Sequence, residues 1–169
     1  MRGMHKTIST SIGNLTLFVD DDGAITRVDF GDGAAAPAAA RTGEADPAAD
    51  RGAGALDAAA AQLSEYLAGE RTAFDLPVRA TGNAFERLVW AELARIPYGE
   101  TASYGEVAER IGHPGKARAV GRANARNPIA IVCPCHRVIG SDGSLTGYAG
   151  GLESKRVLLT LESGALSLL

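Results

Sequence analysis

Apolar and polar residues alternate in two short runs near the start of the chain. The apolar positions of these runs are Leu15, Leu17 and Val19, followed by Ile25, Val28 and Phe30. A period of two is that of a β-strand with one buried face, and Asp-Asp-Asp-Gly at 20–23 favours a tight turn between the runs. The pattern predicts two paired strands, preceded by a third strand at 6–10. The aspartates are interpreted as a solvated turn and not as a calcium loop, because the later ligands of such a loop are missing.

Residues 31–54 consist mostly of Gly, Ala, Pro and Asp and carry almost nothing to bury. This composition predicts a flexible loop. A helical period begins at Leu56, and Gly69 is suited to end that helix. The predicted inward positions of the helix are Leu56, Ala60, Leu63 and Leu67. Alternating apolar residues at 74–78 then predict a short strand or an extended connector, which leads out of a first domain spanning 1–80.

The second predicted domain, 81–169, begins with a helix whose apolar residues recur every three or four positions and which ends before Pro97. Ser103 and Glu106 have the spacing of a capping box, which starts a short helix. A glycine-containing turn follows, and a further helix is predicted from Lys116 to Ala125. Two short helices separated by such a turn have the outline of a helix-turn-helix.

The second of these helices presents small residues, Ala119, Gly121 and Ala123, where a reader of the major groove would carry long polar side chains. Such a face allows close approach to a nucleic-acid backbone or to a narrow groove, without sequence readout. The alternative is a tight helix–helix contact inside the protein.

The last part of the chain predicts a small wing followed by a helix. A strand is expected at 138–139, a turn at 141–144, a pliant loop at 147–151 and a final helix at 152–162. Together the elements predict an α+β protein. It would have a small N-terminal α/β domain with a short antiparallel sheet, and a C-terminal helical domain of winged-helix or helix-turn-helix type.

The 169 residues are 46% hydrophobic and 22% charged, as in a globular protein with an ordinary core. No apolar run is long enough to cross a bilayer and the N-terminus lacks the apolar segment of a secretory signal, so we expect no membrane partner and a cytoplasmic location. The net charge of −3 is unevenly shared: 1–80 carries seven Lys/Arg against twelve Asp/Glu, and 81–169 carries ten against eight. A polyanionic partner would meet the second domain, although an ordinary solvated surface is an equally good interpretation of these charges.

The candidate for chemistry is Cys135, in the segment Pro-Cys-His-Arg-Val at 134–138. Thiolate is the reactive form of cysteine, and cationic surroundings favour it. His136 follows directly, and no Asp or Glu occurs from 111 to 140. The basic residues of that stretch are Lys116, Arg118, Arg122, Arg126 and Arg137. Cys133 and Cys135 are too close to bridge without strain and fit a reducing compartment; with three histidines in the chain, neither a zinc site nor a cofactor is expected.

These motifs resemble those of the O6-alkylguanine-DNA alkyltransferases, also called methylated-DNA–protein-cysteine methyltransferases. The residues that carry the resemblance are Pro134-Cys135-His136-Arg137-Val138, Arg118-Ala119-Val120-Gly121, Asn127-Pro128, Gly147-Tyr148 and Gly150-Gly151. The match runs from about Phe85 to Glu162, and the first domain is compatible with the family's small N-terminal domain. No separate zinc-bearing phosphotriester module is seen in the sequence.

The resemblance implies that Cys135 attacks the alkyl carbon of O6-alkylguanine, and of O4-alkylthymine, in duplex DNA. The group would stay on sulfur irreversibly, so each molecule would act once and need no cofactor. His136 would act as a water-mediated base oriented by Glu162. Tyr104 would donate a hydrogen bond to the flipped base, and Asn127 would be the hinge between the recognition helix and the active-site strand.

The target atom lies inside the duplex, so the base must leave the stack. The resemblance implies that Arg118 fills the vacated space and that the second helix binds the minor groove. The residues expected to contact DNA are Ser103, Tyr104, Arg118, Ala119, Gly121 and Arg122. The residues expected to line the base pocket are Val138, Tyr148, Ala149 and Gly150. The expected partner is double-stranded DNA, bound by a monomer.

Two residues depart from the family pattern. Glu86 stands where Gln is usual and is interpreted as a surface change; Cys133 stands where a branched apolar residue is common and is interpreted as packing, not as a second reactive thiol. Three other functions stay open at this point. A cysteine hydrolase would turn over, a non-catalytic DNA-binding relative would lack the cysteine, and a Cys-x-Cys redox or metal module would need further ligands.

Overall fold

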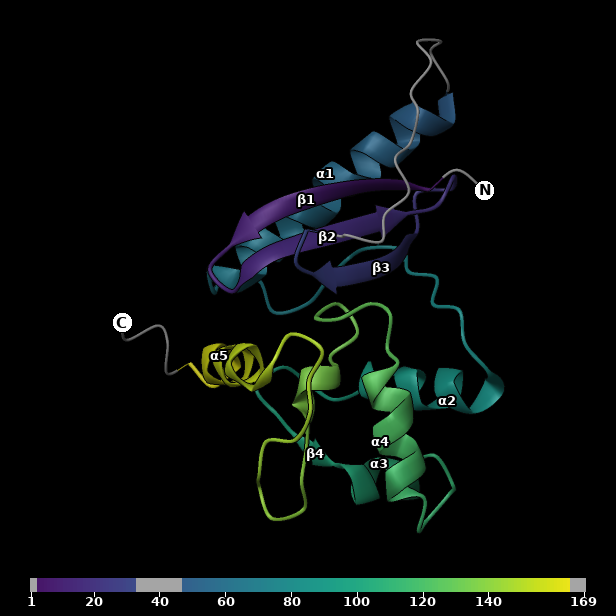
Figure 1. Ribbon diagram of the computed structural model, residues 1–169, viewed down its shortest axis with the longest axis vertical. Helices are drawn as coiled ribbons and strands as arrows, with labels where there is room; N and C mark the ends of the chain where they lie inside the picture. The colour runs from purple at the N-terminus through teal and green to yellow at the C-terminus, as the bar shows by residue number, and fades with distance from the viewer. Residues whose placement is uncertain (1–2, 33–46, 165–169) are drawn as a thin grey trace. The chain divides into compact units, whose positions relative to one another are not determined.

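The structure, a computed structural model, describes residues 3–32 and 47–164. The chain forms two compact units, Met1–Ala80 and Thr81–Leu169 (Figure 1). Strands dominate the first unit and helices the second, so the predicted α+β class is confirmed. In the described part of the chain no helix is both long enough and apolar enough to span a lipid bilayer.

Three antiparallel strands form the sheet of the first unit, in the order β1 (Met4–Thr10), β2 (Gly13–Val19) and β3 (Ile25–Phe30). They occupy the segments that the alternating pattern predicted, including the third strand. Leu15 and Leu17 of the central strand are fully buried, as the period of two requires. Thr16 between them is also buried, and its hydroxyl donates to the carbonyl of Gly31 at 2.8 Å. Both faces of the central strand are therefore covered.

One long helix, α1 (Pro47–Leu67), covers one face of this sheet (Figure 1). Residues 47–54 are helical, so the loop predicted for 31–54 is wrong over that part, whereas 33–46 lie outside the described residues. The Gly-rich composition was misleading because Gly52 serves packing. A Cβ at Gly52 would stand 2.4 Å from the sulfur of Met4 on β1, so the helix lies directly against this side chain, which would have to move to admit a larger residue.

The buried residues of α1 differ in part from the predicted ones, whereas the helix ends before Gly69 as predicted. Its fully buried members are Leu56, Ala59, Leu63 and Tyr66, whereas Ala60 and Leu67 are half-buried. After the helix, Gly69 adopts a φ of 79°, which costs glycine little. Its amide donates to the carbonyl of Tyr66 at 3.0 Å, and that of Glu70 donates to Glu65 at 2.8 Å. These are the two hydrogen bonds of a Schellman motif.

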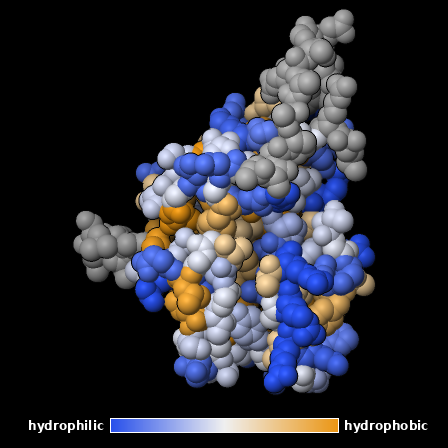
Figure 2. Space-filling view, in the orientation of Figure 1, coloured by the Kyte–Doolittle hydropathy of each residue, from blue (hydrophilic) through white to orange (hydrophobic). Residues whose placement is uncertain are grey.

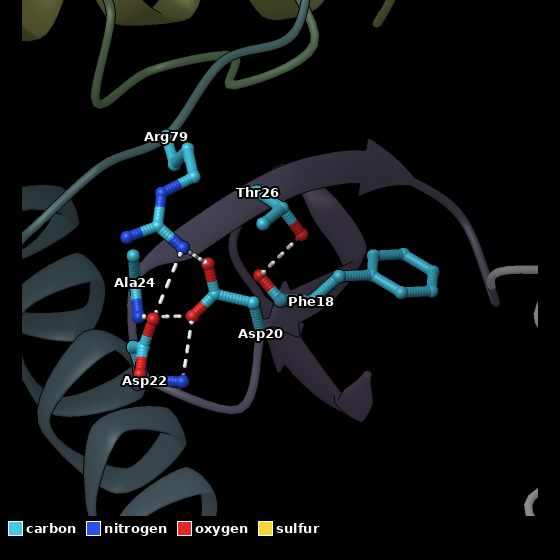
Figure 3. A network of polar contacts seen from close by, with 6 residues as sticks. All are labelled: Phe18, Asp20, Asp22, Ala24, Thr26 and Arg79. Atoms are coloured by element: carbon cyan, nitrogen blue, oxygen red, sulfur yellow. Dashed lines mark hydrogen bonds and ion pairs between the residues drawn. The ribbon is translucent and has the colours of Figure 1, made fainter. Parts of the chain in front are cut away.

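Hydrogen bonds to Asp20 hold the aspartate turn between β2 and β3 closed (Figure 3). Asp20 is buried, and its carboxylate accepts hydrogen bonds from the amides of Asp22 and Ala24, both at 3.0 Å, and from the guanidinium of Arg79. Backbone hydrogen bonds of 2.8 Å also join the connector that carries Arg79 to Ile25. The predicted solvated turn is therefore only partly right, because Asp20 is enclosed while Asp22 stays exposed. No group of three metal-ligating side chains occurs among the described residues.

The second unit begins with three helices: α2 (Ala84–Leu93), α3 (Tyr104–Arg110) and α4 (Ala117–Ala125). Capping boxes start the first two. In the second box, the hydroxyl of Ser103 accepts from the amide of Glu106 at 3.1 Å, as the sequence spacing predicted. Helices α3 and α4 are the two helices of the predicted helix-turn-helix.

The small sheet of this unit differs from the predicted wing. Strand β5 (Val138–Ile139) forms where predicted, but it pairs in parallel with β4 (Ala102–Ser103) instead of turning back as a hairpin. The turn at 141–144 is present, with the amide of Gly140 donating to the carbonyl of Ser144 at 2.9 Å. The described chain closes with α5 (Leu152–Glu162), near the predicted bounds.

Candidate active site

The backbone makes two tight turns just before the side chain of Cys135. The amide of Val132 donates to the carbonyl of Ala130, and the amide of Cys135 donates to the carbonyl of Cys133, both at 2.8 Å. Both bonds close three-residue γ-turns. The first is centred on Ile131, whose φ of 72° is strained for a β-branched residue. Cys135 then opens the short 3₁₀ turn η1 (Cys135–Arg137), where its side chain is buried.

Glu162, the last residue of α5, holds the two residues after the cysteine. Its Oε2 lies 2.9 Å from Nε2 of His136. Arg137 contacts the same carboxylate twice, with Nε 2.7 Å from Oε1 and Nη2 2.9 Å from Oε2, and donates through Nη1 to the carbonyl of Ile96 at 2.6 Å. A carboxylate only accepts, so Nε2 of His136 carries the proton and Nδ1 has the lone pair that can take up another. His136, Arg137 and Glu162 are all buried.

Lys155 on α5 is a fully buried cation close to the cysteine. Its Nζ donates to the carbonyls of Val138 at 2.7 Å and Thr146 at 2.9 Å. Both acceptors are neutral, whereas the charge of Arg137 is balanced by Glu162. The positive charge that favours a thiolate at Cys135 therefore comes from Lys155. The sequence-based expectation that the basic residues of 111–140 would supply it is wrong.

Two asparagines fix the backbone around the nucleophile. Asn127 donates through Nδ2 to the carbonyl of Cys133 at 3.0 Å and accepts from the amide of Ile129 at 3.1 Å. It also hydrogen-bonds to the side chain of Cys135. Asn124, buried on α4, donates to the carbonyl of Cys135 at 3.4 Å. The helix α4 and the reactive turn are thus directly joined.

Burial dominates the protonation of the reactive pair. It raises the pKa of Cys135, against the opposing effects of the Asn127 hydrogen bond and the Lys155 charge. It lowers the pKa of His136 below the ordinary 6.5, against the opposing effect of Glu162. The resting protein therefore holds a thiol beside a neutral imidazole, a pair between which a proton can pass. This corrects the expectation of a depressed thiol pKa, because desolvation outweighs the nearby cation.

Tyr104 lies between α4 and the loop that precedes α5. A Cβ at Gly121 would lie 3.8 Å from its ring, in ordinary contact. Its hydroxyl lies 2.7 Å from Oγ1 of Thr146. The neighbouring Ser103 uses its own hydroxyl to cap α3, so that side chain serves the helix start.

The exposed side of α4 carries Arg118 and Arg122, with Ala119 and Gly121 half-buried beside them. In the space-filling view a hydrophilic strip lies over this helix (Figure 2). Ala123 is buried instead, and its carbonyl accepts a hydrogen bond from the indole of α2 at 2.8 Å. The predicted face of small residues is therefore wrong for Ala123, which makes the helix–helix contact offered as the alternative.

The four residues expected to line a base pocket differ in burial. Val138 is fully buried, and its carbonyl accepts a hydrogen bond from Lys155 of α5. Tyr148 and Gly150 are half-buried and Ala149 is exposed. The amide of Gly151 donates to the carbonyl of Tyr148 at 2.9 Å, which closes the loop before α5. Val138 thus belongs to the packed interior, while 148–150 form a surface loop.

Of the two departures from the family pattern, Glu86 makes specific contacts near the surface. Its side chain is 12% exposed, accepts from the amide of Asn83 at 3.1 Å and pairs with the exposed Arg126 at 3.1 Å. These contacts cap α2 and form an ion pair, which adds detail to the predicted surface change. Cys133 lies with its sulfur 3.8 Å from the carbonyl of Trp90, and burial raises its pKa to about 12. Such a thiol is inert, in agreement with a packing role.

Sequence reasoning missed three contributors to this site: Lys155, Thr146 and Ile96. For Lys155 a signal existed, because it shares a helical face with Leu158 and Glu162 at spacings of three and seven. Thr146 and Ile96 act through contacts to residues 42 and 41 positions away, which no local pattern reveals.

Family models match both units of the chain. Residues 84–164 match the model described as 6-O-methylguanine DNA methyltransferase, DNA binding domain, and residues 4–80 match 6-O-methylguanine DNA methyltransferase, ribonuclease-like domain. The chain belongs to the 6-O-methylguanine DNA methyltransferase family. This agrees with the resemblance seen in its motifs, and the DNA binding domain model spans the described site.

Individual members of the methyltransferase family align along most of the chain. The methylated-DNA–protein-cysteine methyltransferase of Mycolicibacterium paratuberculosis is 51% identical over 159 residues, which is 94% of this chain and 91% of that protein. The crystal structure of Mycobacterium tuberculosis OGT in complex with DNA has a TM-score of 0.79 and 47% identity, covering 95% of this chain and 92% of that one. The crystal structure of the Mycobacterium tuberculosis O6-methylguanine methyltransferase has a TM-score of 0.79 and 43% identity, covering 99% of each chain.

Proposed function

We propose that this protein repairs DNA by transferring the alkyl group of O6-alkylguanine, and of O4-alkylthymine, irreversibly to its own Cys135. The observation that carries the proposal is the buried arrangement of Cys135, His136 and Glu162, in which the carboxylate fixes the proton on Nε2 of the imidazole. Relatives covering nearly the whole chain bear the name of this activity. A relative crystallised with DNA shares the fold.

The transfer is a displacement at carbon. The thiol proton of Cys135 passes, through a water molecule, to Nδ1 of His136, which burial keeps neutral. The sulfur then forms a bond to the alkyl carbon as the bond from that carbon to O6 breaks, and the electron pair leaves with guanine. Lys155 stabilises the thiolate, and Tyr104 donates a hydrogen bond to the base as it gains negative charge. Guanine then regains a proton, and the thioether remains on the protein.

The base reaches this site only outside the helix, because the reacting oxygen lies within the duplex. In this proposal α4 enters the minor groove, where Ala119 and Gly121 permit close approach and Arg118 occupies the space left by the extruded base. Arg122 contacts phosphate from the same helix. Arg137 is excluded from this role because it is buried against Glu162. Binding should therefore be salt-dependent and show little sequence preference.

The reaction consumes the protein, one molecule for each lesion, and requires no cofactor. We expect the protein to act as a monomer. We also propose that the protein acts in the cytoplasm.

Intact-mass spectrometry after mixing with duplex DNA that contains O6-methylguanine tests this function. We expect one added methyl group per protein, mapped to Cys135, together with plain guanine in the DNA. The amount repaired should plateau at the amount of protein added. Cys135→Ser is the matched control, and it should bind the same DNA within a few-fold while taking up no methyl group.

Two results would point elsewhere. Repeated turnover would indicate an enzyme of another class, such as a cysteine hydrolase. Unmodified protein bound to unrepaired DNA would indicate a non-catalytic reader of alkylated bases.

A further inference from the structure

The hydroxyl of Tyr104 is paired across the site with Thr146. The two oxygens lie 2.7 Å apart, and the residues are 42 positions apart in sequence. Tyr104 begins α3, whereas Thr146 stands in the loop before α5, next to the residues that line the proposed base pocket. The contact therefore joins two segments that border the same pocket.

Thr146 is fixed by its backbone as well as by its side chain. Its carbonyl accepts from Nζ of Lys155 at 2.9 Å, and the same Nζ donates to the carbonyl of Val138 at 2.7 Å. Because Lys155 is fully buried, this link anchors Thr146 to the interior although its side chain is exposed. The hydroxyl of Thr146 is thus presented from a fixed point of the loop.

The ring of Tyr104 is half-buried and borders α4 at Gly121, where an added Cβ would stand 3.8 Å from it. With the phenolic oxygen 2.7 Å from Thr146, the direction of the phenolic proton depends on what else contacts that oxygen. A phenol is both donor and acceptor, so the partner decides which role it plays.

We propose that Thr146 is a positioning residue that directs the phenolic proton of Tyr104 toward the extruded base. Without a base, the more acidic phenol donates to Thr146. When the base enters, Thr146 donates to the phenolic oxygen and the phenolic proton turns to the base. The two hydrogen bonds in series strengthen each other, so Tyr104 better stabilises the negative charge that develops on the leaving base. This inference rests on the proposed alkyl transfer.

The first test compares single-turnover rates of methyl transfer from duplex O6-methylguanine. Thr146→Val keeps the shape but removes the hydroxyl, and we expect the rate to fall by about fivefold to tenfold, as for one hydrogen bond that acts in the transition state. Thr146→Ser should restore the lost rate. The matched control is Ser144→Ala in the same loop, whose hydroxyl donates to Asp142 at 2.6 Å, away from Tyr104, and its rate should equal that of the wild type.

A double-mutant cycle separates positioning from loop damage. In a Tyr104→Phe background, Thr146→Val should cost no further rate, because the proton that it directs is gone. Alkylation of Cys135 by iodoacetamide, which presents no base, should run at the same rate in the wild type and in Thr146→Val. Additive losses in the cycle, or slower reaction with iodoacetamide, would overturn the inference while leaving the proposed function intact. If the wild type takes up no methyl group, the proposed function fails and this inference fails with it.

Discussion

Each unit of the molecule contains a buried carboxylate bound by an arginine, and the two pairs serve different ends. In the first unit, Asp20 accepts from two backbone amides and from Arg79, whose side chain is 57% exposed (Figure 3). In the second unit, Glu162 accepts from His136 and from Arg137, whose side chain is 9% exposed. The first carboxylate closes a turn, and the second one holds the imidazole of His136.

The two pairs differ in the groups that hydrogen-bond to the carboxylate in addition to the arginine. Backbone amides need an acceptor in order to hold a turn, and water can partly replace Arg79 there. His136 is titratable, and its neighbour Cys135 is nucleophilic, so the same ion pair next to them fixes a tautomer and a proton path. An arginine–carboxylate contact is therefore not itself a sign of function. The role of such an ion pair depends on which further groups the carboxylate binds.

The comparison is tested most strongly by neutralising each carboxylate in turn. Glu162→Gln should slow methyl transfer by about 100-fold, because the imidazole loses its fixed orientation. It should also lower the free energy of unfolding by about 3–5 kcal/mol, since Arg137 stays buried without a counter-charge. Asp20→Asn should lower that free energy by only about 1–2 kcal/mol and leave the rate unchanged. Single-turnover kinetics and urea unfolding measure both effects; equal rate losses in the two variants would erase the distinction.

Arg118, an exposed arginine of the second unit, provides a second comparison, with the buried Arg137. Arg118→Ala should slow repair of duplex DNA by roughly tenfold to a hundredfold, because Arg118 supports the extruded base and unstacking costs a few kcal/mol. Reaction with free O6-benzylguanine should be unaffected, since a free base needs no extrusion. Arg122→Ala serves as a control on the same helix: it should weaken DNA binding but leave the rate at saturating duplex DNA unchanged, because a phosphate contact does not support the extruded base. Equal slowing on both substrates would show that Arg118 acts on chemistry or folding.

Lys155 offers a smaller test of the electrostatics in the second unit. Its charge lowers the pKa of Cys135, against the larger raising effect of burial. Lys155→Met should therefore raise that pKa further, and the rate of alkylation by iodoacetamide should begin to climb at a higher pH than in the wild type. Intact mass measured across a pH series follows the reaction. An unchanged pH profile would mean that the buried lysine serves only to hold the loop through the carbonyls of Val138 and Thr146.

The smallest expected effect concerns the second thiol. Cys133→Val should leave the rate of methyl transfer within about twofold of the wild type, as for a substitution that keeps size and burial. Burial raises the pKa of Cys133 to about 12, so it contributes no thiolate near neutral pH. Peptide mapping of the methylated wild type should find no label there. A methyl group on Cys133 would contradict its role in packing.

Local pattern was enough for the three strands of the first unit, for the capping box at Ser103 and for the glycine that ends α1. Each depends on residues near one another in the sequence, such as the alternation of Leu15 and Leu17 or the φ of 79° at Gly69. The helix at 47–54 could not be predicted in this way. Within it, Gly52 lies against Met4, which is 48 residues earlier in the sequence, and no local pattern reveals that contact.

For the site, family resemblance located Cys135, His136 and Glu162, but the charges around them required the structure. Sequence alone grouped Arg137 with the other basic residues of 111–140, because nothing local shows that it turns inward toward Glu162. The raised pKa of Cys135 likewise reflects desolvation, which depends on packing and not on neighbours in the sequence.

The contacts of Glu162 also affect when the protein becomes competent during its synthesis. The ribosome adds Glu162 after His136, to which it binds across 26 positions. At about 5–20 residues per second, the interval between them is roughly one to five seconds. In that time the nascent chain already contains its nucleophile but lacks the carboxylate that orients the base. If Glu162 acts as proposed, the acceptor cannot be competent until α5, the last described helix, has been made.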